Sequence, residues 1–161
     1  YQYGTDRFFD DFHAAGVNSI LVADLSIDDA DEVVAPAKAA GLDTVFMVTP
    51  NTEPERKKLI LSKTTGFVYT VSLLGVTGSR NSLSGTITEL IAGLKKLTDV
   101  PICVGFGISK AEHAKTVADA GADGMIIGTR IVRIIEENLD NKKQIPEKVA
   151  AFIKEMKKAI V

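Results

Sequence analysis

Five short apolar runs alternate along the chain with longer segments in which apolar residues recur at helical spacing. The runs are nearly continuous rather than alternating with polar residues, which is typical of strands covered on both faces. The predicted strands are Ser19–Asp24, Thr44–Val48, Gly66–Ser72, Pro101–Gly105 and Gly124–Gly128. The predicted helices are Asp6–Ala15, Asp28–Ala40, Glu53–Ser62, Thr86–Leu97, 109–120, Thr129–Leu139 and Pro146–Ile160. Strands that alternate with helices in this way predict a parallel sheet with helical crossovers.

Two capping-box patterns mark the starts of helices, and one connection between a strand and a helix is unusually long. The segments 52–55 (TEPE) and 109–112 (SKAE) have the pattern of a capping box, so Thr52 and Ser109 are predicted to cap the helices that follow. The connection Leu73–Ser84 is longer than the usual strand-to-helix loop of about 2–6 residues. It is rich in Gly, Ser, Thr and Asn, and we expect it to form a lid.

Glycine-rich turns end three of the predicted strands, at 75–78, 105–107 and 128–129, and each is followed by a helix. Backbone N–H groups at a helix N-terminus bind anions, and glycine allows close approach, so we expect one shared pocket for a phosphate ester. A doubly wound sheet normally places its phosphate loop after the first strand, whereas a (βα)8 barrel places it after strands 7 and 8. The pattern therefore favours an α/β fold of the TIM-barrel family, here a partial barrel of about five βα units that correspond to strands 4–8.

Composition excludes several other classes of protein. The 161 residues are 45% hydrophobic and 25% charged, which is typical of one globular domain, and we expect residues 1–161 to form a single partial barrel domain. A net charge of −2 without a block of like charges argues against a nucleic-acid partner. No apolar run approaches the roughly 20 residues of a membrane helix. The single cysteine, Cys103, suits a reducing compartment such as the cytoplasm, and one cysteine with two histidines offers no metal-ligand cluster.

Four segments carry a resemblance to a known family: SILVADL, GFVYTVSLLGVTG, PICVGFGIS and GADGMIIGTRIV. In this order and spacing they resemble the last two-thirds of a tryptophan synthase α chain. The resemblance implies cleavage of indole-3-glycerol phosphate to indole and glyceraldehyde 3-phosphate. It also implies a β chain as partner, which receives the indole and holds the pyridoxal phosphate, so no cofactor is expected in this chain.

Six residues are candidates for substrate binding. Gly78, Gly107, Gly128 and Thr129 are expected to contact phosphate, while the plainer explanation of the glycines is tight turns. Tyr69 and Phe106 are expected to line the indole pocket, with ordinary core filling as the alternative.

The resemblance also implies supporting roles for two residues, and at two other positions this sequence differs from the usual family pattern. Thr77 resembles a loop threonine that orders the catalytic carboxylate, and Asp24 lies where an α chain faces its β chain. Ser26 stands where the family usually has proline, and Leu73 stands where it often has arginine.

The family's catalytic Glu and Asp belong to strand 2 and the loop after it, and neither can be matched in this sequence. We therefore expect no useful lyase turnover from this chain alone. Two other hypotheses remain open at this stage. One is another phosphate-binding barrel enzyme, such as a sugar-phosphate isomerase or epimerase. The other is a non-catalytic fragment that self-associates through its exposed sheet edges.

Overall fold

A single five-stranded parallel sheet forms the centre of the molecule. The structure is a computed structural model that describes residues 2–71, 80–105 and 107–160, and for residues 80–84 it describes the backbone alone. The strands follow one another in sequence order, β1-β2-β3-β4-β5. They are β1 (Ser19–Leu21), β2 (Asp43–Val48), β3 (Val68–Val71), β4 (Ile102–Gly105) and β5 (Gly124–Ile126). The described helices are α1 (Thr5–Ala14), α2 (Asp31–Ala39), α3 (Pro54–Ser62), α4 (Arg80–Leu94), α5 (Ala111–Asp119), α6 (Thr129–Glu136) and α7 (Ile145–Lys158), with a 3-10 turn, η1 (Leu139–Gln144).

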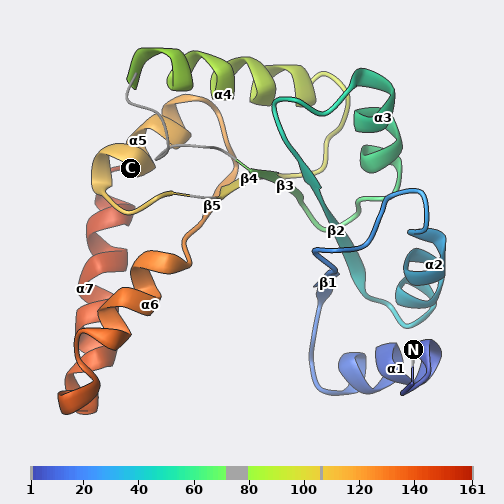
Figure 1. Ribbon diagram of the computed structural model, residues 1–161, viewed down its shortest axis with the longest axis horizontal. Coiled ribbons are helices and arrows are strands. Elements are labelled where there is room, and N and C mark those ends of the chain that lie inside the picture. The colour runs from blue at the N-terminus through green and yellow to red at the C-terminus, as the bar shows by residue number, and fades with distance from the viewer. Residues whose placement is uncertain (1, 72–79, 106, 161) are drawn as a thin grey trace.

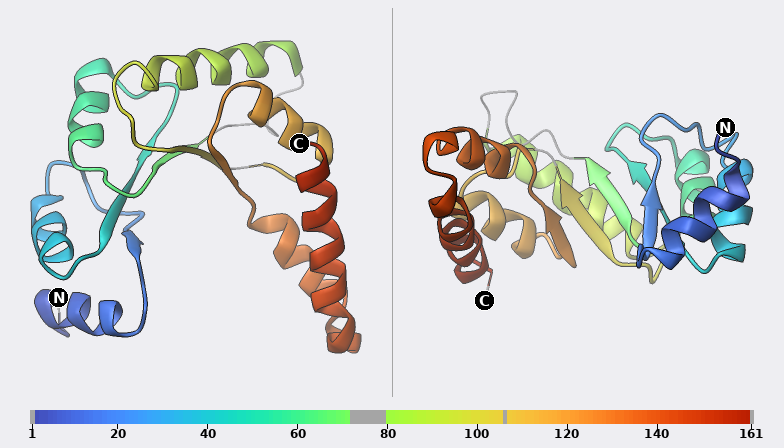
Figure 2. Two further views of the ribbon diagram at one scale, coloured as in Figure 1. Left: turned by 180° about the vertical axis from the view of Figure 1, so that it is seen from behind. Right: turned by 90° about the horizontal axis from the view of Figure 1, so that it is seen from below.

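The sheet curves into an arch, and the helices lie along its outer side (Figure 1). Helices α1 and α2 cover one end of the arch beside β1, whereas α6 and α7 cover the other end beyond β5 (Figures 1 and 2). All four strand pairs are parallel, so every strand points its carboxyl end toward the same edge of the sheet. The expected partial barrel of five βα units is therefore confirmed.

The outer face of the sheet packs against the helices and forms the main core. Val68 and Thr70 of β3 are fully buried on this face, and the Thr70 hydroxyl donates a 3.0 Å hydrogen bond to the carbonyl oxygen of Cys103. The buried members of this core come from β2, β3, β4 and the helices above them, and include Phe46, Val48, Ile60, Ile87, Leu90, Ile91, Leu94, Ile102, Val104 and Val117. Burial of each such side chain contributes about 1.5–3 kcal/mol, so the helix-covered face accounts for most of the fold's apolar stabilisation.

The inner face of the sheet has no layer of described elements against it. Met47, Tyr69 and Cys103 are register partners across β2, β3 and β4, so they lie in one row on this face. Each of them is only partly buried, although their neighbours along each strand are buried under the helices. This alternation follows from the two-residue period of a strand.

Sequence and structure differ at several element ends. Strand β1 stops three residues before the expected Asp24, because it is a short strand paired only with β2 among the described strands. Strand β5 stops before Gly128, which instead precedes the first turn of α6. Helix α4 begins at Arg80 rather than Thr86, so the expected loop Leu73–Ser84 is wrong over its last five residues, and residues 72–79 lie outside the described chain.

Neither predicted capping box forms. The Thr52 hydroxyl accepts the backbone N–H of Thr49 at 3.0 Å, so it closes the preceding turn instead of capping α3. The side chain of Ser109 makes no cap on α5. Its backbone N–H donates to Nδ1 of the half-buried His113 at 3.3 Å, so this histidine stabilises the turn before α5. In the first case a backbone N–H three residues earlier takes the hydroxyl that would cap the helix, and in the second a side chain four residues later takes the backbone N–H that the capping box needs.

Candidate functional site

The glycine turns after β4 and β5 meet at one edge of the sheet. Gly107 follows the end of β4 by two residues, and Gly128 follows the end of β5 by two residues. Strands β4 and β5 are neighbours, with Gly105 of β4 paired to Ile126 of β5. The two turns therefore lie side by side at the carboxyl edge, where barrel enzymes place their active sites.

The two glycines differ in what the backbone requires of them. Gly107 has a φ of +81°, a conformation that costs other residues about 1–2 kcal/mol. Gly128 has a φ of −111°, and a Cβ built there would meet no atom of the described residues within 4 Å. A tight turn thus explains the glycine at position 107, but neither backbone conformation nor packing against the described residues explains the one at position 128. Open space directly before a helix is what close approach of a ligand requires.

The first turn of α6 carries the positive end of the helix dipole at this edge. Thr129 is the first residue of the helix, and its side chain is exposed. The first backbone N–H groups of a helix have no partner within it, so they can donate to an anion. The Arg130 guanidinium pairs with the carboxylate of Glu137 at 3.2 Å, which draws its charge along the helix and away from the first turn.

Tyr69 reaches from β3 across to the end of β4. Gly105 is paired directly with Val71, so Tyr69 meets it along the diagonal. A Cβ built at Gly105 would lie 2.6 Å from Cζ of Tyr69 and 2.8 Å from Cε1. The tyrosine ring therefore lies against the bare backbone of Gly105, and its hydroxyl end points toward the carboxyl edge. This arrangement places an aromatic ring beside the turn that contains Gly107.

Asp24 occupies an exposed turn directly after β1. It lies on the same edge of the sheet, but at the opposite end of the arch from the turns that follow β4 and β5. The structure thus separates this carboxylate from the tyrosine and the glycine turns, and it does not join them in one site.

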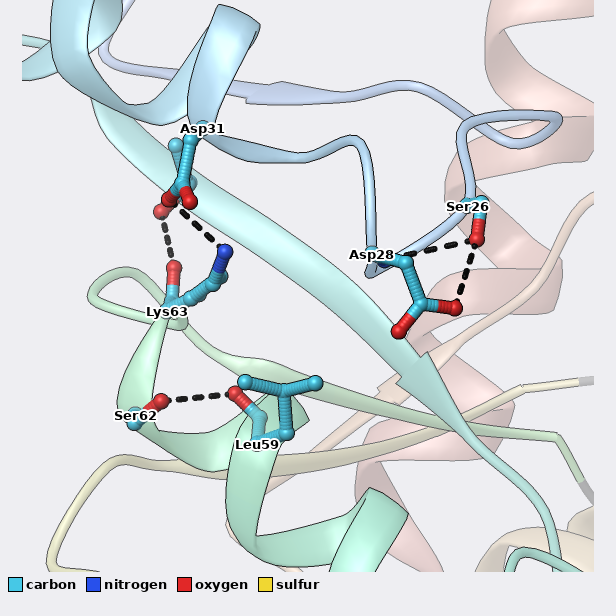
Figure 3. Close-up of polar contacts among 7 residues, drawn as sticks. Ser26, Asp28, Asp31, Leu59, Ser62 and Lys63 are labelled. Atoms are coloured by element: carbon cyan, nitrogen blue, oxygen red, sulfur yellow. Dashed lines mark hydrogen bonds and ion pairs between the residues drawn. The ribbon is translucent and has the colours of Figure 1, made fainter.

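A polar cluster that the sequence did not reveal lies near Asp24. One carboxylate oxygen of Asp28 accepts hydrogen bonds from the Ser26 hydroxyl at 3.2 Å and from the Arg56 guanidinium at 3.1 Å (Figure 3 shows the serine and aspartate). Ser26 and Arg56 also line a cavity of about 160 Å³ between the ends of β1 and β2. At the start of α2, the carboxylate of Asp31 pairs with the ammonium group of Lys63, the residue that follows α3, at 2.7 Å (Figure 3). Arg56 and Asp28 are 28 residues apart in the sequence, so no local sequence pattern could have predicted their pairing.

Asp123 holds the opposite edge of the sheet together. Its carboxylate accepts the backbone N–H of Ile102 at 2.9 Å and pairs with the Lys95 ammonium group at 2.9 Å. The backbone hydrogen bond, followed by the lysine, holds the pKa of Asp123 below its usual value. This carboxylate is at the amino end of β4, away from the glycine turns, so its role is to fix the strand.

Three of the candidate residues, Thr77, Gly78 and Phe106, lie outside the described residues. Within residues 2–71, 80–105 and 107–160, no group of three or more His, Cys, Asp or Glu side chains is arranged to hold a metal ion. Over the same ranges, no helix combines the length and apolar character needed to cross a membrane.

Fold and edge geometry together define a parallel βα half-barrel with glycine turns at the carboxyl ends of its last two strands. The chain belongs to the tryptophan synthase alpha chain family, because the sequence model of that family matches residues 1–161. The resemblance noted from the sequence is therefore confirmed.

Individual relatives agree with this assignment. The tryptophan synthase alpha chain of Methanoregula boonei is 43% identical over 159 residues, which cover 99% of this chain and 60% of the relative. That of Methanocaldococcus jannaschii is 44% identical, covering 91% of this chain and 52% of the relative. A solved tryptophan synthase a2b2 complex from Pyrococcus furiosus contains a chain that superposes with a TM-score of 0.85 at 38% identity, over 97% of this chain and 62% of that one. The chain thus spans about 60% of the length of the curated relative from M. boonei.

Proposed function

We propose that this chain supplies the phosphate-binding and indole-binding part of a lyase that cleaves indole-3-glycerol phosphate to indole and glyceraldehyde 3-phosphate in tryptophan biosynthesis. The observation that carries the proposal is the meeting of Tyr69, Gly107 and Gly128 at the carboxyl edge in a member of this family. The phosphate dianion is held by backbone N–H groups of the Gly107 turn and of the first turn of α6, together with the Thr129 hydroxyl. Gly78 is proposed as a further donor.

The indole ring is placed against the aromatic face of Tyr69, which stays partly exposed on the inner face of the arch. Phe106 is proposed to line the same pocket from the turn after β4. An aromatic ring beside an anion site suits a substrate that joins an indole to a phosphorylated glycerol chain. Thr77 is proposed to order the catalytic carboxylate of the assembled enzyme.

Cleaving the bond between the indole ring and the glycerol chain requires one group to donate a proton and another to accept one, each within hydrogen-bond reach. Asp24 is at the far end of the arch, and Asp28 is already paired with Arg56. Neither is placed to do this work beside Tyr69. The proposal therefore assigns the acid and the base to the part of the family's barrel that these 161 residues do not include, and predicts no useful turnover from the chain alone.

The β chain of tryptophan synthase is proposed as the partner of the assembled enzyme, with Asp24 on the contact surface. The solved P. furiosus relative is an a2b2 complex, and Asp24 is exposed at the carboxyl edge, where the product must leave. Pyridoxal phosphate belongs to that partner in this proposal, and the chain itself needs no cofactor. We further propose that residues 1–161 form one domain and act in the cytoplasm.

Titration calorimetry with indole-3-glycerol phosphate, and separately with inorganic phosphate, tests the proposed function. The chain should bind both without releasing indole. Gly128→Asp should weaken both affinities at least tenfold, because a carboxylate at the start of α6 repels the phosphate. Gly93→Asp is the matched control, since a Cβ at that glycine of α4 also meets nothing within 4 Å. Equal effects of the two substitutions, or no binding of either ligand by the parent chain, would exclude the assigned phosphate site.

A further inference from the structure

The loop of residues 22–30, which we call the Asp24 loop, joins β1 to α2 across a cavity. Strand β1 pairs with β2 only as far as Leu21, which lies opposite Val45, whereas β2 continues to Val48. A cavity of about 160 Å³ lies where the two segments diverge. It is lined from the loop and from β2 by Val22, Leu25, Phe46 and Met47, among others. The first half of the loop therefore lies over open space and not directly against β2.

The second half of the loop is anchored at one apolar and one polar point. Ile27 is 4% exposed and belongs to the main core. Next to it, the carboxylate of Asp28 accepts a hydrogen bond from the Arg56 guanidinium of α3 at 3.1 Å. The Ser26 hydroxyl donates to the same carboxylate at 3.2 Å and accepts the backbone N–H of Asp28 at 3.3 Å (Figure 3). These bonds close a turn around Ile27, and Asp24 lies on the exposed stretch between the end of β1 and this turn.

The ion pair between Arg56 and Asp28 is too exposed to contribute much to overall stability. The two side chains are 49% and 61% exposed, and pairs of this kind are weakened by water and by the cost of ordering both side chains. Arg56 nevertheless joins α3 to the loop, and its side chain lines the cavity beneath it. One buried side chain fixes a point of the loop but not its orientation, and the guanidinium supplies the second point. The effect of the pair is therefore expected in the position of the loop.

We propose that Arg56 is a positioning residue, which acts through Asp28 to hold the Asp24 loop in the place where it contacts the partner β chain. A loop that is already ordered loses less conformational freedom on binding, so it binds more tightly than a loop that must be ordered by its partner. The identity of the partner rests on the proposed function. The restraint on the loop is a property of the isolated chain and does not depend on the partner or on lyase activity.

The ion pair between Lys63 and Asp31 provides a matched control. It also joins residues far apart in the sequence, at 2.7 Å, and its carboxylate comes three residues after Asp28 (Figure 3). That carboxylate belongs to α2, however, and not to the Asp24 loop. Lys63→Gln therefore removes the same charge as Arg56→Gln and also breaks a pair between two elements, but it leaves the turn within the loop in place.

Hydrogen exchange of the isolated chain tests the restraint. The backbone N–H groups of Asp29 and Ala30 donate to carbonyl oxygens within the loop at 3.1 and 3.4 Å, so their exchange reports whether the turn stays closed. They should exchange at least fivefold faster in Arg56→Gln, less than twofold faster in Lys63→Gln, and close to the parent rate in Arg56→Lys, which keeps the cation. The urea midpoint of Arg56→Gln should stay within about 0.5 M of the parent value. Equal acceleration in the two glutamine variants, or none in Arg56→Gln, would overturn the positioning role.

Calorimetric titration with the β chain of the P. furiosus complex tests the consequence for the partner. Arg56→Gln should weaken binding at least tenfold, Arg56→Lys should restore it to within threefold of the parent chain, and Lys63→Gln should change it less than twofold. Asp24→Asn should also weaken binding. If Arg56 acts through the loop, adding Asp24→Asn to Arg56→Gln should weaken binding little further. Effects that multiply would instead indicate that the arginine contacts the partner itself, and would contradict its positioning role.

The two measurements separate this inference from the proposed function. Binding of the β chain that Arg56→Gln leaves unchanged would overturn the inference and leave the proposed partner in place. Faster exchange in Arg56→Gln, together with no binding of the β chain by the parent chain, would refute the partner contact, while the restraint of the Asp24 loop by Arg56 would stand.

Discussion

Replacing Gly105 by alanine tests whether the Tyr69 ring depends on a bare backbone beside it. The glycine lies within β4 and is extended, so alanine fits its backbone conformation. Its new Cβ would nevertheless lie 2.6 Å and 2.8 Å from two ring carbons of the tyrosine. Carbon atoms in contact are normally about 3.5–4.0 Å apart. The ring must therefore retreat by about 1 Å, and it can do so only toward the open inner face.

The expected cost follows from overpacking. Inserting one methyl group into a filled space costs about 1–3 kcal/mol. Because the tyrosine ring can retreat toward the open inner face, we expect Gly105→Ala to lower the free energy of unfolding by an amount at the lower end of this range, about 1 kcal/mol. In a chain that already carries Tyr69→Ala the obstacle is gone, so the same substitution should cost close to nothing. The coupling between the two positions should thus be about 1 kcal/mol, within the range for contacting residues.

Urea unfolding of the four chains at 25 °C, followed by circular dichroism, measures this coupling. Gly93→Ala provides the control pair with Tyr69→Ala, because a Cβ at Gly93 meets nothing within 4 Å and should act independently of the tyrosine. Indole-3-glycerol phosphate should also bind more weakly to the Gly105→Ala chain. If Gly105→Ala costs the same in both backgrounds, within about 0.5 kcal/mol, the tyrosine does not lie against this glycine and its place in the proposed indole pocket is lost.

Further predictions concern the two glycine turns and the amino edge of the sheet. Gly107→Ala should lower the free energy of unfolding by about 1–2 kcal/mol because of the positive φ at this position. Gly128→Ala should change the free energy of unfolding by less than about 0.5 kcal/mol but should reduce the affinity for phosphate. Urea unfolding measures the first effect and calorimetric titration the second, and similar losses of stability for the two variants would contradict the different roles assigned to the two glycines. Asp123→Ala should cost about 1–2 kcal/mol at pH 7 because the Ile102 N–H loses its acceptor, while Asp123→Asn keeps an acceptor oxygen and should cost less. The folded chain lowers the pKa of Asp123, so the stability that this carboxylate provides is present above its unfolded-state pKa near 4 and is lost as pH falls through the lower folded-state pKa. Urea midpoints between pH 6 and pH 2.5 should therefore fall less steeply for Asp123→Asn than for the parent chain, and parallel slopes would rule out this linkage.

The order and kind of the secondary structure could be predicted from local patterns. Continuous apolar runs and helical spacing are set by which faces are buried, so five strands and the helices between them follow from the sequence. The positions of Gly107 and Gly128 at one edge also follow, because parallel strands align their carboxyl ends. Element ends were less predictable. Strand β1 stops early because, among the described strands, it is paired on one side only, and the backbone N–H of Ser109 donates to His113 while its side chain caps no helix.

Contacts between residues far apart in sequence could not be predicted in this way. The fit of Tyr69 against Gly105 depends on a diagonal across two strands whose register the sequence alone does not give. The pairing of Asp28 with Arg56 depends on how closely the loop after β1 approaches α3. Only the backbone angles show that Gly107 is required by its positive φ whereas Gly128 is not. This difference between the two glycines is the strongest support for a ligand beside Gly128.

Cys103 offers a direct readout of how far the inner face of the sheet protects a side chain from solvent. It is the only cysteine in the chain, and its sulfur lies over Gly124, where an added Cβ would be 2.8 Å away. Partial burial, with a smaller contribution from the charge of Asp123, raises the pKa of this thiol. Since the thiolate is the reactive form, its reaction with a disulfide reagent at pH 8 should be slower in the folded chain than in urea.

The rate in urea calibrates the reagent, because the unfolded chain exposes the thiol fully. A folded chain in which Cys103 reacts as fast as in urea would show that its place between β3 and β5 does not protect the thiol.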